Sequence, residues 1–509
     1  ADNLVDRVTY AAGVMSTVAN GAIENIDPHA AENAPGVIAV LHHGNIPALQ
    51  RVPDDMENKL KAAEERTPFE DDKIYYAGQF VALVVAETFE QATHAATLVT
   101  VRYAEEKPVV QLEEALDRLQ VPKNFRGGER PPDSKRGDPE RAFDPAPVQL
   151  DETYTTPVEH HNPMEPHAAI ASWEGDRLTI YHATQSVMGS RERVATLLGL
   201  PVEGVRVISD YVGGGFGSKG STWPHVTLTA MAAKLARRPV RLVLTRRQMF
   251  TAHGYRSKTI QRVRLAADRD GKLVAMMHDG RAQTSLIGEF TEPVGLATEI
   301  MYSCANVGVT HRVAALNVAM PTFMRAPGEA SGMYALESAM DELAYRVGID
   351  PLELRLRNYA EKDEAKNLPF TSKELRACYA QGAEAFGWSR RNHQPGAMRD
   401  GHLLIGWGMA SATYPGLRSA AGATVRVERD GTVIVRSATQ DIGTGTYTTM
   451  TQVAAETLGV PVEQVRAELG DSDMPKAPVS GGSQTSASVL PAVQAAAQKL
   501  RQQILSLAH

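Results

Sequence analysis

GDRLTIYHATQ (175–185), followed by LGLPVEGVRV (198–207), is the first copy of a pattern that occurs twice. The second copy is DGTVIVRSATQ (430–440), followed by LGVPVEQVRA (458–467). Each copy reads strand, Ala-Thr-Gln, helix and Leu-Gly-x-Pro-Val-Glu-x-Val-Arg, and the copies lie about 260 residues apart. Pro after a helix-ending Gly stops the helix, and the Val-x-Val that follows starts a strand. One common helix–loop–strand junction could arise twice by chance, but agreement at both ends of the unit favours a duplication. Two related lobes that face each other predict a cleft between them, which is a favoured place for a ligand.

Three loops rich in Gly, Ser and Thr precede helix-like segments. GGGFGSK (213–219) precedes TLTAMAAKLA (227–236), IGTGT (442–446) precedes a second helix, and SGGSQTS (480–486) precedes a third from about Val489 to Leu507. Glycine lets the backbone approach a ligand closely, and the free N–H groups of a helix start favour anionic oxygens. Ser and Thr hydroxyls add donors. Three such loops across the duplicated lobes predict a large phosphate-bearing ligand.

The rest of the chain divides by composition. We expect a mixed α/β domain over 1–119, in which GVIAVL (36–41) and QFVALVVA (79–86) are buried strands. The segment 120–147 is dense in Pro, Gly and charge and is expected to be an exposed linker. A first lobe over 148–375 and a second over 376–509 follow.

Overall composition excludes several classes of protein. The 509 residues carry a net charge of −7, so there is no basic excess for bulk nucleic-acid binding. No apolar run approaches the roughly 18 residues of a membrane span, and no signal peptide is visible at the start. The only cysteines, Cys304 and Cys378, exclude a disulfide framework and are too few to hold an iron–sulfur cluster.

Two known site patterns match in part. Gly215, Gly217 and Gly220 satisfy G-x-G-x-x-G, and Arg246 and Arg247 could accept the phosphate of NADP, so an NADP-dependent dehydrogenase is an alternative interpretation. That interpretation leaves the other two loops unexplained.

A metal site is suggested by His160, His161 and His167 beside Glu165, but the zinc spacing HExxH is absent. Packing and hydrogen bonding are the favoured role of this segment.

Taken together, the motifs resemble the xanthine oxidase family of molybdenum hydroxylases along nearly the whole chain. They are HNPMEPHAAIA (161–171), the glutamine of HATQSVMGSRERVA (182–195), GGGFGSK (213–219), MRAPGEASGMYALESAMDELA (324–344), GIDPLELRLRN (348–358) and DIGTGTYT (441–448). The chain looks like the large molybdenum-binding subunit of bacterial members, above all aldehyde oxidoreductases. The resemblance implies an α+β fold: an α/β "hammerhead" domain, then two related cofactor-binding lobes, the second incomplete at its C-terminal end.

The resemblance also implies roles for individual residues. Gln185 and Arg325 would be catalytic, with Gln185 and Phe216 near the apical oxo ligand of molybdenum and Arg325 on the substrate side. The substrate pocket would include Pro327 and Tyr414. The molybdopterin cytosine dinucleotide would be held by Gly215, Phe216, Gly217, Ala326, Gln440, Ile442, Gly443, Thr444, Gly445, Ser483, Gln484, Thr485 and Ser486. No protein side chain is expected to ligate the metal directly.

In this family the reaction is hydroxylation with water as the oxygen source, and electrons leave through iron–sulfur clusters. Because this chain lacks the cysteines, the resemblance implies a separate iron–sulfur subunit and an FAD subunit. Gly220 and Pro327 replace an acid and an aromatic residue of purine-oxidising members, which favours a small aldehyde over a purine. The cytoplasm and the periplasm are both compatible, since a partner could carry an export signal.

One expected feature of the family has no counterpart. The catalytic Gly-x-Gly-Glu is not found, since Gly288-Glu289 and Gly328-Glu329 stand in other contexts. We therefore expect the general base to come from outside these 509 residues, with a second chain completing the second lobe as one source. The chain alone is predicted to be inactive. A subunit that binds cofactor without activity of its own is the remaining alternative.

Overall fold

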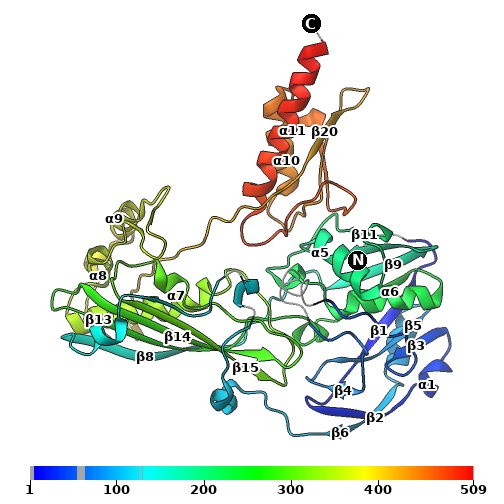
Figure 1. Ribbon diagram of the computed structural model, residues 1–509, viewed down its shortest axis with the longest axis horizontal. Coiled ribbons are helices and arrows are strands. Elements are labelled where there is room, and N and C mark those ends of the chain that lie inside the picture. The colour runs from blue at the N-terminus through cyan, green and yellow to red at the C-terminus, as the bar shows by residue number, and fades with distance from the viewer. Residues whose placement is uncertain (1–4, 54–63, 124, 129, 508–509) are drawn as a thin grey trace.

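The computed structural model describes residues 5–53, 64–123, 125–128 and 130–507. Asn124 and Glu129 of the expected linker and the last two residues of the second lobe lie outside this part. Three bodies are visible in Figure 1: a sheet with the N-terminal segments, a second sheet beside it, and a smaller unit above both that ends in the red C-terminal helix. None of the helices in the described ranges is long and apolar enough to cross a bilayer.

A seven-stranded sheet joins the N-terminal region to the first lobe. Its strands, in spatial order, are β11 (Val205–Ile208), β10 (Arg177–His182), β9 (Ala168–Glu174), β12 (Val240–Val243), β1 (Thr9–Met15), β5 (Phe80–Ala86) and β3 (Val37–His42). β1 pairs in parallel with β12 and antiparallel with β5. All seven residues of β5 are buried, as a continuous apolar run predicts, and the expected strands over 36–41 and 79–86 are confirmed.

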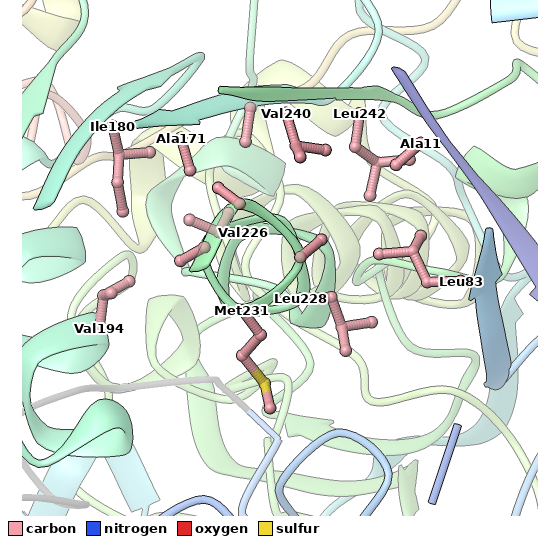
Figure 2. Packing of buried hydrophobic residues seen from close by; sticks show 14 of the residues in the cluster. Ala11, Leu83, Ala171, Ile180, Val194, Val226, Leu228, Met231, Val240 and Leu242 are labelled. Carbon is pink, nitrogen blue, oxygen red and sulfur yellow. The ribbon is translucent and has the colours of Figure 1, made fainter. Parts of the chain in front are cut away.

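Helix α6 (Pro224–Ala236) packs against this sheet and forms the core of the first lobe (Figure 2). Proline at its first position fits, because a helix start leaves that N–H unbonded in any case. Figure 2 shows Val226 below Ala171 and Val240 of the sheet, with Leu228 and Met231 farther round the helix. The core therefore lies directly beside the chain that carries GGGFGSK.

The remaining N-terminal elements are the three strands of a small sheet and two helices that pack on β1, β3 and β5 of the seven-stranded sheet. They are β2 (Gly21–Asp27), β4 (Lys73–Ile74), β6 (Thr100–Glu105), α1 (His29–Glu32) and α3 (Phe89–Ala96). Thr88 and Gln91 make a capping box at the start of α3, which fixes where that helix begins.

A five-stranded sheet forms the second body. Its order is β7 (Ser134–Arg136), β15 (Val307–Leu316), β14 (Leu273–Ser285), β13 (Thr259–Ala267) and β8 (Val148–Thr156). Helix α7 (Glu329–Val347) packs on β8 and β13, and α8 (Pro351–Arg357) follows it.

The expectation of an exposed linker over 120–147 is wrong. Phe125 is buried against His311, β7 is an edge strand of the sheet, and α4 (Pro139–Phe143) packs on β14. Arg130 donates two hydrogen bonds to the buried Glu299, at 2.9 and 2.7 Å. Polar groups of this segment are therefore partnered by ion pairs and by edge-strand pairing.

Short elements connect the second body to the second lobe. They are the hairpins β16 (Lys362–Asp363) with β17 (Leu368–Pro369) and β18 (Arg399–Asp400) with β19 (Leu403–Leu404), and α9 (Leu375–Phe386). The second lobe contains β20 (Thr424–Val427), β21 (Val433–Ser437), β22 (Val465–Leu469), α10 (Thr446–Leu458) and α11 (Thr485–Leu507).

The duplicated pattern is confirmed in three dimensions. In each copy a strand leads to a helix and then to a parallel partner strand: β10, α5 (Val187–Leu198) and β11, then β21, α10 and β22. Gly199 and Gly459 end the two helices at φ 65° and 74°. Pro201 and Pro461 both have φ −57°.

The two copies meet at the ends of β11 and β22. The Ser209 N–H donates to the Gly470 carbonyl at 2.7 Å, and the Ser472 N–H donates to the Val207 carbonyl at 3.0 Å. These backbone bonds hold the lobes edge to edge, so the loops that follow both copies converge.

Candidate active site

A cavity of about 1200 Å³ lies where the lobes converge. It collects most of the residues selected from the sequence: Gln185, Gly215, Phe216, Gly217, Arg325, Ala326, Pro327, Tyr414, Ile442, Gly443, Thr444, Ser483, Gln484, Thr485 and Ser486. Gln440 and Gly445 lie behind its wall. Six segments of the chain, from Gln185 to Ser486, thus share one chamber, as the predicted cleft between the lobes requires.

Gln185 joins the two lobes at this chamber. Its Oε1 accepts a hydrogen bond from the Gly217 N–H at 2.9 Å, and its Nε2 donates to the Ser480 carbonyl at 2.8 Å. The Ser480 N–H in turn donates to the Gln185 carbonyl at 2.8 Å. The buried amide therefore fixes the glycine loop of the first lobe against the third loop, and its second Nε2 proton is available to a bound group.

A buried ion pair holds the glycine loop 213–219 in place. Lys219 is fully buried, and its Nζ donates to Glu165 Oε2 at 2.6 Å and to the Glu165 carbonyl at 3.0 Å. The same carboxylate oxygen accepts the Gly213 N–H at 2.8 Å. Burial lowers the pKa of Lys219, and the Glu165 charge opposes that effect. Glu165 is thus a loop anchor.

The second loop differs from the expectation that its N–H groups are free. Asp441 Oδ1 accepts the N–H groups of Gly443, Thr444 and Gly445, at 2.9, 3.0 and 3.2 Å. A carboxylate of the chain itself therefore occupies the start of α10, where an anion is favoured. What this loop offers the cavity is the Thr444 side chain and the open glycine backbone.

The third loop leads straight into α11, which begins at Thr485, four residues before the expected start. The first N–H groups of a helix have no partner within it, and Ser483 to Ser486 line the cavity. Gln440 supports this loop, because the Ser480 hydroxyl donates to its carbonyl at 3.1 Å. This is the best anion site of the three loops.

Arg325 lies on a segment without regular secondary structure that closes the opposite wall. Its backbone N–H donates to the Phe216 carbonyl at 2.9 Å. Its side chain is exposed and has no hydrogen bond or ion pair with the rest of the described chain. The guanidinium is therefore available to a polar group in the cavity.

Backbone strain concentrates around the chamber. Nine non-glycine residues in the described ranges have positive φ, and four of them line the cavity: Arg126, Phe216, Ala326 and Ser483. Such conformations cost free energy and cluster where a ligand is held. Phe216, at φ 56°, is 43% exposed, so its ring lies at the surface of the chamber.

Several cavity residues were missed by the sequence analysis. Glu64 comes from the N-terminal region; burial raises the pKa of its carboxyl to about 7, and it accepts the Tyr76 hydroxyl at 3.0 Å. The Glu289 and Glu329 set aside as being in the wrong context also line the wall. Apolar side chains complete it: Phe290, Met320, Phe323, Met324, Met333 and Leu417. No local motif marks these positions, because tertiary packing alone brings them together.

The histidines of this segment make hydrogen bonds and ring contacts. His161 Nε2 lies 3.0 Å from the Phe323 carbonyl, and His167 Nε2 lies 3.2 Å from Ser218 Oγ. The His167 and His253 rings are stacked with centroids 4.3 Å apart. Within the described ranges, no three His, Cys, Asp or Glu side chains are arranged to hold a metal ion.

The dinucleotide fingerprint does not lie in the fold that would support it. A dinucleotide-binding unit needs adjacent parallel strands joined by the helix. Here β10 and β9 separate β11 from β12, and β12 pairs antiparallel with β9. Helix α6 also begins four residues after Gly220, outside the cavity wall. The NADP-dependent dehydrogenase interpretation is therefore wrong for this loop.

Family models match three consecutive parts of the chain. Residues 2–107 match the a/b hammerhead domain of aldehyde oxidase and xanthine dehydrogenase, and 120–359 and 381–509 match two molybdopterin cofactor-binding domains.

Individual proteins that are similar to this chain point to the same family as the family models. The chain is 40% identical over 501 residues to the aldehyde oxidoreductase molybdenum-binding subunit PaoC of Escherichia coli (strain K12), covering 98% of this chain and 66% of PaoC. It is 30% identical over 528 residues to the putative xanthine dehydrogenase molybdenum-binding subunit XdhA of the same organism, covering 99% of this chain and 70% of XdhA. Among solved structures, the aldehyde oxidoreductase of Desulfovibrio gigas matches with a TM-score of 0.79 and 24% identity, over 98% of this chain and 57% of that one. The chain thus spans about two thirds of its curated relatives.

The cavity fits the group that these domains bind. A Cβ added at Gly443 or Gly445 would meet no atom within 4 Å, so the second loop leaves open space. The Gln185 amide, the hydroxyls of the third loop and the first turn of α11 supply donors to a large group with anionic oxygens. On this fold, this cavity and these matches, the chain belongs to the xanthine oxidase family, as one of its molybdenum-binding subunits.

Proposed function

We propose that this chain provides the cofactor and substrate chamber of an enzyme that oxidises aldehydes to carboxylic acids. The observation that carries the proposal is the convergence of Gln185, Phe216 and Arg325 on one cavity between the lobes. The reaction is RCHO + H2O → RCOOH + 2 H⁺ + 2 e⁻, with water as the oxygen source. The molybdenum cofactor supplies the two-electron redox chemistry when it is bound.

The cofactor is proposed to be molybdopterin cytosine dinucleotide. Its pyrophosphate suits Ser483 to Ser486, because those residues combine hydroxyls with the free N–H groups of α11. Gln185 and the glycine loop would hold the molybdenum end. Gln440 and Gly445 act from behind the wall, by supporting the second and third loops.

Arg325 is proposed to bind and orient the aldehyde. Its free guanidinium can donate to a carbonyl oxygen, and the apolar wall with Tyr414 accommodates the rest of the substrate. Pro327 leaves more room than the aromatic residue of purine-oxidising members, which supports an aldehyde as substrate.

The electrons are proposed to leave through an iron–sulfur subunit and an FAD subunit. PaoC, which this chain resembles, is named as one subunit of an aldehyde oxidoreductase. Either the cytoplasm or the periplasm would suit the assembly. We predict that the 509 residues alone do not turn over, and that activity requires further polypeptide to supply the general base.

The test is Arg325→Ala in the assembled enzyme. We expect kcat/KM for an aldehyde to fall about 100-fold while molybdenum per chain, measured by plasma mass spectrometry, stays near the wild-type value. The exposed Arg429→Ala in a surface turn is the matched control and should change neither quantity. Parallel loss of molybdenum and turnover would make Arg325 a structural residue, and a wild-type assembly without molybdenum would remove the proposal.

A further inference from the structure

The segment 324–328, here called the strap, carries Arg325, Ala326 and Pro327 on the cavity wall. It has no regular hydrogen-bonded structure, and it contains two positive φ angles, 61° at Ala326 and 88° at Gly328. A backbone in such a conformation persists only when its surroundings determine it. The groups that hold the strap therefore set the position of the Arg325 backbone, from which its side chain extends.

One end of the strap is held by Arg256. Its Nη2 donates to two successive carbonyls, Met324 O at 2.7 Å and Arg325 O at 2.6 Å. Its Nη1 donates to Glu159 Oε2 at 2.8 Å, which fixes the plane of the guanidinium. The Arg256 side chain is 7% exposed. A planar group with several fixed donors can do this, whereas a lysine ammonium cannot reproduce the same geometry.

The other end is held by Glu292, which is fully buried. Its Oε1 accepts the Gly328 N–H at 2.8 Å and the Ser331 hydroxyl at 2.9 Å. The same oxygen lies 3.6 Å from Arg256 Nε, within ion-pair distance when the Glu292 carboxyl is ionised. Arg256 thus holds the start of the strap and Glu292 holds its end, and the two side chains lie next to each other.

We propose that Arg256 and Glu292 are positioning residues that set the orientation of Arg325 toward the substrate. Neither side chain lines the cavity, so both act through the strap. The inference rests on the proposed function, because it assigns Arg325 to the substrate.

The first test uses Arg256→Lys in the assembled enzyme. We expect kcat/KM for an aldehyde to fall about tenfold or more, mainly through KM, with molybdenum per chain unchanged. Arg262→Lys is the matched control, because Arg262 also makes a paired contact to a carboxylate, Asp151, but at the surface. It should leave kcat/KM at the wild-type value.

A double mutant separates positioning from a general structural role. If Arg256 acts only through Arg325, then Arg256→Lys should cost little further activity in an Arg325→Ala background. Additive losses would overturn the proposal, and so would a fall in molybdenum that matches the fall in turnover.

A third measurement does not depend on turnover. Amide hydrogen exchange of the Gly328 peptide should be faster in Glu292→Met, which removes the acceptor of the Gly328 N–H, than in the wild type, while the α6 core keeps its protection. If Arg256→Lys fails to fold, Arg256→Met/Glu292→Met removes both partners together and should show the same loss of kcat/KM and faster exchange. Unchanged exchange at the strap would refute the clamp. Faster exchange in an assembly that oxidises no aldehyde would support the clamp and reject the proposed function instead.

Discussion

At the residue scale, the backbone packing around the glycine loop leaves no room for a side chain at Gly217. Gly217 has φ 114°, and a Cβ placed there would lie 2.2 Å from the Phe323 carbonyl oxygen. The obstacle is backbone, so a substitution must move either the loop or the chain that leads to Arg325. A motif in the sequence reveals the glycine, but only the fold reveals what it touches.

We predict that Gly217→Ala lowers the free energy of unfolding by about 3 kcal/mol or more, because strain and overlap add. Molybdenum content should fall with it. Gly431→Ala is the control, since Gly431 also has positive φ but has no atom near a Cβ, and it should cost about 1 kcal/mol. Denaturant titration of both variants measures the difference, and equal costs would contradict the account.

The Lys219–Glu165 pair predicts an asymmetry between its two partners. Lys219 has no exposed surface, whereas the Glu165 side chain is 23% exposed. Glu165→Gln leaves a buried cation unpaired and should cost about 3 kcal/mol of stability. Lys219→Met leaves a carboxylate that water can reach and should cost less. The double variant Glu165→Gln/Lys219→Met should have the same free energy of unfolding as Lys219→Met alone in denaturant titrations. A smaller loss of stability in Glu165→Gln than in Lys219→Met would contradict the role of this ion pair as the loop anchor.

Much of the site could be predicted from the sequence because its residues sit in local motifs. Of the fifteen predicted positions that line the cavity, all but Tyr414 belong to such motifs. Glu64, Arg256 and Glu292 carry no such signal. Their roles depend on which buried groups face each other, and residue order alone does not contain that information. The Asp441 carboxylate was also missed as a cap, although it is adjacent to its loop.

At the scale of elements, the repeat was the most reliable guide. Helix ends marked by Leu-Gly-x-Pro place strands, turns and caps in the same order in both lobes. The sequence could not show that β1 enters the sheet of the first lobe, because that pairing depends on long-range packing. It also misrepresented 120–147, where edge-strand pairing overrides a composition typical of linkers.

The repeat predicts that its two helix ends respond alike. Gly199→Ala and Gly459→Ala each place an L-residue at a left-handed helix end and should each cost about 1 kcal/mol. An added Cβ at Gly199 meets only the mobile end of Gln50, and at Gly459 it meets nothing. Thermal unfolding of the two variants provides the comparison. A difference larger than about 2 kcal/mol would mean that the two ends are not equivalent.

At the scale of the whole molecule, buried histidines set the response to acid. Burial lowers the pKa of His161 and His182 to about 4 and of His253 and His278 to about 3, and those of His167 and His225 lie well below the usual value. These rings are neutral in the folded protein but bind protons below about pH 6.5 once unfolded. Their stabilising contribution is therefore complete above pH 6.5 and is lost as the pH falls toward 4 and then 3.

Carboxyls whose pKa is raised by burial act in the opposite direction. Burial raises the pKa of Glu64 and Glu292 to about 7, so their contribution is complete below about pH 4.5 and is lost as the pH rises through 7. Among the described residues, nine histidines with a lowered pKa outnumber four carboxyls with a raised pKa, so we predict a net loss of stability between pH 6.5 and 4.5. Each net proton taken up on unfolding adds about 1.4 kcal/mol per pH unit to the slope.

The measurement is the free energy of unfolding as a function of pH. His225→Met should make the slope shallower by about one proton, because neither ring nitrogen of His225 has a hydrogen-bond partner among the described residues. A wild-type protein equally stable at pH 7.5 and 5 would contradict the prediction.

The place of β1 in the middle of the seven-stranded sheet has a consequence for biosynthesis. Thr9 pairs with Val240, so β1 leaves the ribosome about 230 residues before one of its two partner strands. Until then β1 presents an unpaired edge, which is the kind of surface that other chains or chaperones bind. The N-terminal region and the first lobe consequently mature together, and a cut between them would leave both fragments with an open sheet edge.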